Sequence, residues 1–202
     1  MRELLNATRK QMENTSGIYL VGDAGSNASL DNRSINGDLN WFDPMDAITT
    51  YRYLDTSNRW HEILGNASAN YPKWRSILNS KGIKFIPNAY PGFDNTEHSK
   101  WENGSSEGVV LLLNEIMFKE MLNIAINNAG DDPKMVMITS WNEWLESTAI
   151  EPSTEYGELF LHEVYNIVPE FPAFLVLPLF MVATLVVTIF YKRRCFASAR
   201  LA

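Results

Sequence analysis

Two glutamates three residues apart, set between two tryptophans, are the part of this chain best suited to chemistry. Residues 138–152 read ITSWNEWLESTAIEP, so that Glu143 and Glu146 alternate with Trp141 and Trp144. In a continuing strand, residues three apart point to opposite faces, whereas in a turn or at the start of a helix they point to the same side. The second geometry would let both carboxylates act on one substrate.

Two carboxylates that act on one substrate are what cleavage of a glycosidic bond requires. One carboxylic acid protonates the departing oxygen, and one carboxylate assists at the sugar carbon. Neighbouring aromatic rings can stack on sugar faces and exclude water, which suits a general acid. In the alternative, the tryptophans close the mouth of a barrel while Glu143 and Glu146 face water. The pattern alone leaves both interpretations open.

Apolar runs and helical periodicity predict the elements that must position these residues. We expect strands at residues 18–21, 47–51, 83–89 and 135–140, and helices at residues 2–14, 66–80, 107–128 and 157–167. Polar loops are expected between them, including one directly before residue 107. Strands that alternate with helices indicate βα units and a parallel sheet.

Each predicted strand ends in a polar or aromatic cluster: Asp23, then Tyr51 and Tyr53, then Tyr90 and Asp94, and last the glutamate motif. In a (β/α)8 barrel the carboxyl ends of the strands converge on one face and build the active site. The expected fold class is therefore α/β, with about four βα units of a (β/α)8 TIM-type barrel. An open doubly wound sheet is the alternative, but it usually carries a G-x-G-x-x-G loop, and this sequence has none.

The glutamate motif W-N-E-W-L-E-S-T-x-I-E-P resembles the signature region of glycoside hydrolase family 99, which includes the endo-α-1,2-mannosidases, and of the related WbsX-like proteins. Residues 91–96, PGFDNT, resemble a second segment of the same family, and the two motifs occur in the expected order. The resemblance implies a (β/α)8 barrel that acts on glycans.

The resemblance also implies roles for individual residues. Glu143 would bind or deprotonate the sugar 2-hydroxyl, which attacks the anomeric carbon. Glu146 would be the acid for the leaving group and then the base for water, so that the configuration is retained without a cofactor or a metal. The residues expected to bind substrate are Trp141, Asn142, Trp144, Tyr51, Tyr90, Asp94 and Glu151.

Two positions depart from the family pattern. Ser147 stands where glycine is common, and Leu145 stands where histidine often occurs. Specificity for α-mannan therefore does not follow from the resemblance.

The charge distribution excludes one class of partner. All 24 acidic residues and 13 of the 17 basic residues precede residue 173, so this part carries a formal charge of −11. A surface this acidic argues against binding of nucleic acid, which needs basic patches. The single cysteine, Cys195, allows neither a disulfide within the chain nor a cysteine-based metal site.

The C-terminal region predicts a membrane anchor. Residues 173–191 carry no charge and are long enough to cross a bilayer as a helix, and Lys192, Arg193 and Arg194 follow directly. Basic residues mark the cytoplasmic side, so we expect residues 1–171 outside the membrane. Six Asn-x-Ser/Thr sequons agree with a glycosylated surface: Asn6, Asn14, Asn27, Asn32, Asn66 and Asn103. A buried core helix and chance sequons are the alternatives.

Residues 168–172, VPEFP, together with the apolar segment and its basic flank, resemble an archaeal PEF-CTERM sorting signal. The resemblance implies an archaeal cell-surface protein whose tail is processed by an archaeosortase-type enzyme; a plain C-terminal anchor is the alternative. The expected organisation is a partial barrel over residues 1–167, a linker over 168–172, a transmembrane helix over 173–191 and a short basic tail over 192–202.

The sequence thus predicts a surface-anchored glycoside hydrolase that cleaves α-linked, mannan-like glycans. The alternatives are a WbsX-like enzyme that builds or remodels surface polysaccharide, and a non-catalytic glycan-binding module of the cell envelope. Four strands in about 170 residues are half of what a (β/α)8 barrel takes, and residues 1–10 lack the apolar core of a signal peptide. We therefore expect this chain to be the C-terminal half of a larger barrel; a complete small α/β domain or dimerising half barrels are the alternatives.

Overall fold

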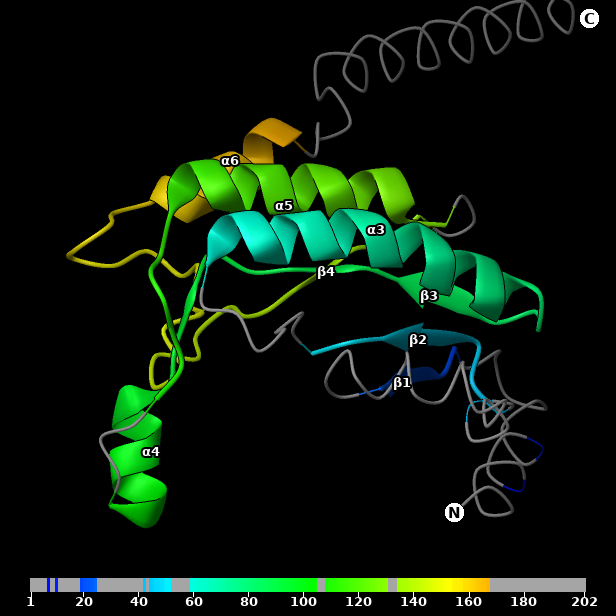
Figure 1. Cartoon of the computed structure of the whole chain (residues 1–202), viewed down its shortest axis with the longest axis horizontal. Helices are drawn as coiled ribbons and strands as arrows, with labels where there is room; N and C mark the ends of the chain where they lie inside the picture. The colour runs from blue at the N-terminus through cyan, green and yellow to red at the C-terminus, as the bar shows by residue number, and fades with distance from the viewer. Residues whose placement is uncertain are drawn as a thin grey trace, which may run out of the picture. The chain divides into compact units, whose positions relative to one another are not determined.

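A computed structural model describes residues 7, 10, 19–24, 42, 44–51, 59–104, 108–130 and 134–167 (Figure 1). The strands are β1 (Val21–Asp23), β2 (Ala47–Thr49), β3 (Lys84–Ile86), β4 (Asn88–Ala89), β5 (Phe93–Asp94), β6 (Val110–Leu111) and β7 (Met137–Ile138). The helices are α3 (Trp60–Asn79), α4 (Thr96–Asn103), α5 (Glu115–Asn128) and α6 (Leu159–Ile167).

The strands that lead to the glutamate motif are parallel. β1 pairs with β2, and β2 pairs with β3, with Ala47 aligned to Lys84. The chain then passes Pro87 into β4, which pairs in parallel with β7. The backbone N–H of Met137 donates to the carbonyl of Pro87 at 2.9 Å, so the β4–β7 ladder extends back to the proline. The parallel sheets β1–β2–β3 and β4–β7, together with the helices between their strands, confirm the predicted α/β class.

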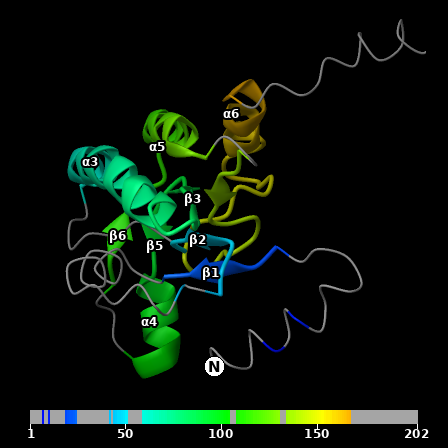
Figure 2. The same cartoon turned by 90° about the vertical axis from the view of Figure 1, so that its right-hand side faces the viewer.

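Two long helices cover one face of this sheet. α3 and α5 pack on each other, and they contact β3 and β4 respectively (Figures 1 and 2). The rings of Tyr71 and Trp74 from α3 pack on Phe85 of β3, with ring centroids 5.3 and 5.9 Å apart. All three side chains are at most 1% exposed, and burial of one such side chain contributes roughly 1.5–3 kcal/mol. This aromatic cluster fixes the helix layer against the sheet.

Helix α3 begins at Trp60, six residues before the predicted start at residue 66. Pro72 lies inside the helix. A proline is best tolerated in the first turn, because in the helix interior its missing N–H removes a backbone hydrogen bond. The first turns are held instead by distant contacts. The indole N–H of Trp60 donates to the carbonyl of Leu112 at 2.8 Å, and its ring stacks on Tyr90 with centroids 6.0 Å apart.

The predicted helix over residues 107–128 is wrong over its first part. Val110 and Leu111 form β6 there, and Leu111 pairs with Phe93 in an antiparallel ladder. The helix α5 starts only at Glu115, because the side chain of Asn114 accepts a hydrogen bond from the N–H of Met117 at 3.0 Å and caps it. The sequence predicts a helix there because Val110 and Leu113 are apolar and three residues apart, as on one face of a helix.

Helix α4 was predicted as a polar loop. It carries no apolar stripe that would announce a helix, and Trp101 is 78% exposed. It ends at Gly104, whose φ of 72° is the left-handed conformation that commonly stops a helix. The strands, in turn, are shorter than predicted, since residues 18–21, 47–51 and 135–140 were expected where the structure has 21–23, 47–49 and 137–138.

Several predictions fall on residues outside the described ranges: most of the helix over residues 2–14, the linker 168–172, the span 173–191 and the tail with Cys195. Within the described ranges, no helix has both the length and the apolar character needed to cross a bilayer. The sequons at Asn66 and Asn103 lie within α3 and α4 rather than in loops.

Candidate active site

The two glutamates lie on a loop that leaves β7 and folds back on itself; we call residues 140–151 the glutamate loop. The N–H of Ser140 donates to the carbonyl of Thr148 at 2.9 Å, and the N–H of Ile150 donates to the carbonyl of Ser140 at 3.0 Å. The hydroxyls of Ser140 and Thr148 also lie 2.8 Å apart. These bonds pin the base of the loop, so the residues between them keep a defined geometry.

Glu143 is held at the start of the loop by backbone contacts. Its N–H donates to the hydroxyl of Ser140 at 2.9 Å, and its carbonyl accepts from the N–H of Thr148 at 3.2 Å. The residue is half-buried, as is Glu146 three positions later. The chain turns between the two glutamates and does not continue as a strand, which is the local geometry that joint action on one substrate requires.

Ser147 completes the turn directly after Glu146. Its φ of 52° lies in the left-handed region, which costs a residue with a Cβ roughly 1–2 kcal/mol. Its N–H donates to the carbonyl of Trp144 at 3.2 Å. Glycine adopts this conformation without steric cost, which explains physically why glycine is common here in the family that the motif resembles.

Tyr51 connects the end of β2 to the glutamate loop. Its hydroxyl donates to Oε2 of Glu146 at 3.1 Å, and its N–H donates to Oδ1 of Asp23 at 3.0 Å. Its carbonyl accepts from the hydroxyl of Thr139, which in turn accepts from Nδ2 of Asn88 at 2.7 Å. Asp23 of β1, Thr139 after β7 and Glu146 of the glutamate loop therefore contact Tyr51 directly, and Asn88 of β4 is linked to it through Thr139. A barrel-type site gathers residues from several strand ends in this way.

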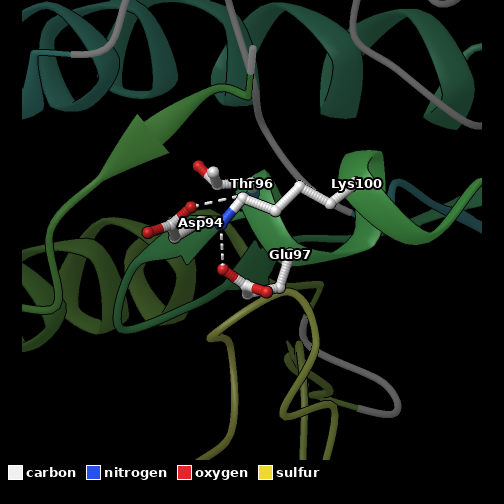
Figure 3. A network of polar contacts seen from close by, with 4 residues as sticks. All are labelled: Asp94, Thr96, Glu97 and Lys100. Atoms are coloured by element: carbon white, nitrogen blue, oxygen red, sulfur yellow. Dashed lines mark hydrogen bonds and ion pairs between the residues drawn. The ribbon is translucent and has the colours of Figure 1, made fainter. Parts of the chain in front are cut away.

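Asp94 joins the two sequence motifs. Its N–H donates to the carbonyl of Glu146 at 2.8 Å, so the segment 91–96 and the glutamate loop lie against each other. Its carboxylate accepts from the N–H of Thr96 at 2.9 Å at the start of α4, where Glu97 and Lys100 form an ion pair at 2.5 Å (Figure 3).

Gly92 permits a close approach of two backbone segments. A Cβ at this position would lie 2.7 Å from Cα of Leu113, and no side chain could move to relieve that contact. The carbonyl of the preceding Pro91 accepts from the N–H of Asn114 at 3.0 Å. The glycine of the PGFDNT motif is therefore required by packing behind the site.

Two aromatic residues of the glutamate loop are exposed. Trp141 is 52% exposed and Trp144 is 50% exposed, and Asn142 between them is also exposed. Glu151 is half-buried, and its N–H donates to the carbonyl of Trp141 at 2.9 Å.

Tyr90 does not fit its expected role in substrate binding. Its side chain is 0% exposed, and its ring packs against Trp60. The sequence placed Tyr90 at a strand end, but the carboxyl end of β4 turns its ring into the core.

A pocket of about 310 Å³ borders the glutamate loop. Trp144, Ser147 and Glu151 line it from the loop, and Glu155, Tyr156 and Phe160 line it from the segment that follows. Glu143 and Glu146 are not among its lining residues. Trp144 is therefore shared between the loop that carries the glutamates and a neighbouring hollow.

Comparison with known proteins shows the family of this chain. The family model described as "Glycosyltransferase WbsX" matches residues 3–164, which is most of the chain. This chain belongs to the WbsX family. The family predicted from the two motifs, a WbsX-like and GH99-like domain, is confirmed.

The WbsX-family chain has relatives named for endo-α-mannosidases. A mouse protein, "Glycoprotein endo-alpha-1,2-mannosidase-like protein", is 30% identical over 100 residues, which cover 48% of this chain and 21% of that protein. The matched part thus spans about a fifth of this curated relative.

One solved structure shows a similar fold. A "Glycoside hydrolase-like protein" has a TM-score of 0.63 at 22% identity and covers 81% of this chain and 48% of that one. A GH99 endo-alpha-mannosidase from Bacteroides thetaiotaomicron is 26% identical, with a TM-score of 0.46 over 70% of this chain and 39% of that one. The predicted α/β class is confirmed, and the fold is similar to that of this glycoside hydrolase-like protein.

Several residues of the candidate site were missed by sequence reasoning. Ser140, Thr148, Thr139 and Asn88 position the loop and Tyr51, but short polar residues at strand ends carry no specific signal. Among the described residues, no group of three or more His, Cys, Asp or Glu side chains is placed to hold a metal ion.

Proposed function

We propose that this domain is a glycoside hydrolase that cleaves α-linked, mannan-like glycans with retention of configuration. The observation that carries the proposal is the hydrogen bond from Tyr51 to Glu146, on the loop that also presents Glu143. This contact orients one of the two carboxylates that the glutamate loop carries, and cleavage of a glycosidic bond uses two such groups.

The proposed reaction uses the substrate's own 2-hydroxyl. Glu143 takes the proton of that hydroxyl, and the oxygen attacks the anomeric carbon to form a 1,2-anhydro sugar. Glu146 protonates the departing glycosidic oxygen. The Glu146 carboxylate then takes a proton from water, which attacks the anomeric carbon and opens the three-membered ring, while Glu143 returns the proton to the 2-oxygen. Two inversions at one carbon give net retention, and no bond to the protein forms.

Three features support a glycan as the substrate. Trp141 and Trp144 expose about half of their surface beside the carboxylates, as stacking on sugar rings requires. The excess of acidic residues disfavours polyanions. The curated relatives carry the name of endo-α-1,2-mannosidases, which favours an α-linked mannose-type glycan for this chain as well.

A transferase is the second candidate, because the matching family model is described as a glycosyltransferase. In that case a sugar hydroxyl in place of water would open the intermediate, and the chain would build or remodel surface polysaccharide. A glycan-binding module without turnover is the third reading. Product analysis separates the three, since hydrolysis yields a free reducing sugar, transfer yields a new linkage, and binding alone yields neither.

The decisive experiment is incubation of the chain and its Glu146→Gln variant with a panel of α-mannans. Loss of general acid–base catalysis is expected to lower the rate of reducing-sugar release by about 10²–10⁴ while sparing binding. Glu120→Gln is the matched control, because it removes one negative charge in the same way from an exposed position of α5. Near-normal release by Glu146→Gln would remove this residue from the mechanism.

We also propose that the domain is held at the outer face of the cell membrane by residues 173–191, with residues 168–172 as a sorting signal for an archaeosortase-type enzyme. The uncharged segment followed by Lys192, Arg193 and Arg194 supports this topology. Protease added to intact cells should remove the domain. A protected domain with a cleaved C-terminal tail would reverse the topology.

A further inference from the structure

The pocket beside the glutamate loop has the size of a small-ligand site; we call it the Trp144 pocket. Its volume of about 310 Å³ lies near the lower end of the range for ligand pockets, roughly 300–1,000 Å³. Its lining contains neither Glu143 nor Glu146, so the proposed cleavage reaction does not account for it.

Aromatic rings form part of the wall of the Trp144 pocket. Trp144 is 50% exposed and Tyr156 is 37% exposed, so both rings offer surface to a ligand. The ring of Tyr156 packs on Phe160 with centroids 5.5 Å apart, and Phe160 packs edge-on against Phe118 at 5.8 Å. Since Phe118 and Phe160 belong to the core, the ring of Tyr156 rests on a rigid support.

A hydrogen-bonded turn presents the polar residues of the pocket. Ser153 and Gly157 exchange backbone hydrogen bonds of 3.0 and 2.8 Å, and the hydroxyl of Ser153 accepts from the N–H of Tyr156 at 2.9 Å. The turn holds Thr154 and Glu155 between its ends, and both line the pocket. The backbone that carries these two residues is therefore fixed before any ligand arrives, which lowers the entropic cost of binding.

The polar lining has one sign of charge. Glu151 and Glu155 supply carboxylates, Ser147 and Thr154 supply hydroxyls, and none of the described Lys, Arg and His residues lines the pocket. Carboxylates accept strong hydrogen bonds from hydroxyl groups and repel anions. Partial burial raises the pKa of Tyr156, and the hydrogen bond to Glu155 and the negative charge of Glu155 raise it further.

We propose that the Trp144 pocket is a second sugar subsite, which takes a neutral hexose unit of the glycan and excludes uronic acids and phosphorylated sugars. The sugar ring lies against Tyr156 and Trp144, and its hydroxyls donate to Glu151 and Glu155. The inference rests on the proposed function, since it assigns this pocket to the same glycan. Because Trp144 belongs to both sites, the hexose unit bound in the pocket determines which linkage of the glycan reaches Glu143 and Glu146.

The test measures binding at the pocket itself in the full chain carrying Glu146→Gln, so that turnover does not interfere. Methyl α-D-mannopyranoside and sodium D-glucuronate are titrated at equal ionic strength, and the amide resonances of Thr154 and Gly157 are followed. We expect the mannoside to shift these resonances and the glucuronate to leave them unchanged. In Tyr156→Ala the mannoside should bind about tenfold more weakly. Tyr165→Ala is the matched control, because this tyrosine of α6 is 60% exposed and does not line the pocket.

Glu155→Lys is a second variant at an exposed position, and it guards against misfolding of Tyr156→Ala. This variant should bind glucuronate and lose the preference for the neutral mannoside. Equal affinity for both sugars in the chain without pocket substitutions, or an unchanged mannoside affinity in Tyr156→Ala, would overturn the subsite. Binding through Tyr156 without any hydrolysis by the wild-type chain would refute the proposed function alone, whereas hydrolysis with binding independent of Tyr156 would refute the subsite alone.

Discussion

The hydroxyl of Tyr51 lies 3.1 Å from Oε2 of Glu146, although the two residues are 95 positions apart in the chain. Both backbone groups of Tyr51 are themselves held, the N–H by Asp23 and the carbonyl by Thr139. The end of one strand thus orients a carboxylate that the end of another strand presents. This relationship ties the fold of the parallel strands to the proposed chemistry.

Tyr51→Phe should lower the rate of cleavage without unfolding the domain. The change removes only the hydroxyl that donates to Glu146, and a hydrogen bond to a charged group contributes about 1.5–3 kcal/mol, less here because Tyr51 is 40% exposed. We expect kcat to fall about tenfold, with the melting temperature within about 2 °C of wild type. Tyr165→Phe controls for loss of a phenol elsewhere. An unchanged pH profile and kcat in Tyr51→Phe would show that the contact has no catalytic part.

Glu143→Gln should abolish turnover at least as completely as Glu146→Gln, because an amide cannot take the proton of the 2-hydroxyl. A substrate that lacks this hydroxyl should fail with the wild-type enzyme as well, and mass spectrometry of the enzyme during turnover should show no sugar adduct. Trapping a covalent sugar on any protein carboxylate would contradict the scheme and indicate a protein nucleophile.

Thr139→Val should destabilise the domain and disturb Tyr51. The hydroxyl of Thr139 accepts from Asn88 and donates to Tyr51, and both Thr139 and Asn88 are at least 96% buried. An isosteric methyl group leaves these polar partners unsatisfied, which costs about 1–3 kcal/mol. Urea unfolding monitored by tryptophan fluorescence measures the loss, and Thr139→Ser should restore most of it. Equal stability of the Val and Ser variants would show that the hydroxyl makes no contribution.

Ser147→Gly should stabilise the domain by about 0.5–1 kcal/mol, because glycine removes the steric cost of the left-handed φ of 52° and this gain exceeds its extra chain entropy. Ser147→Val should destabilise it by more, since a β-branched side chain is a severe outlier at positive φ. Thermal unfolding of the three proteins should therefore rank glycine first and valine last. The reverse order would mean that the turn after Glu146 relaxes to another conformation.

The sequence by itself determined the α/β class, the places of most strands and the two motifs of the family. These features depend on local information: an apolar run such as residues 83–89 predicts a buried strand wherever it lies, and the spacing of Glu143 and Glu146 is read from adjacent residues. The start of α3 and the true extent of α5 were not determined in this way, because they rest on the contact of Trp60 with Leu112 and on the pairing of Leu111 with Phe93.

Only the tertiary structure decided which strand-end residues meet. Tyr51 and Tyr90 look alike in the sequence, since each aromatic ring follows a predicted strand. In the fold, Tyr51 donates to Glu146 while Tyr90 is fully buried against Trp60. The direction of a side chain at the end of a strand depends on the twist of the strand and on the elements packed around it, and these interactions join residues far apart in the chain. No local pattern contains that information, so the partner of Glu146 could be named only once the strands were assembled.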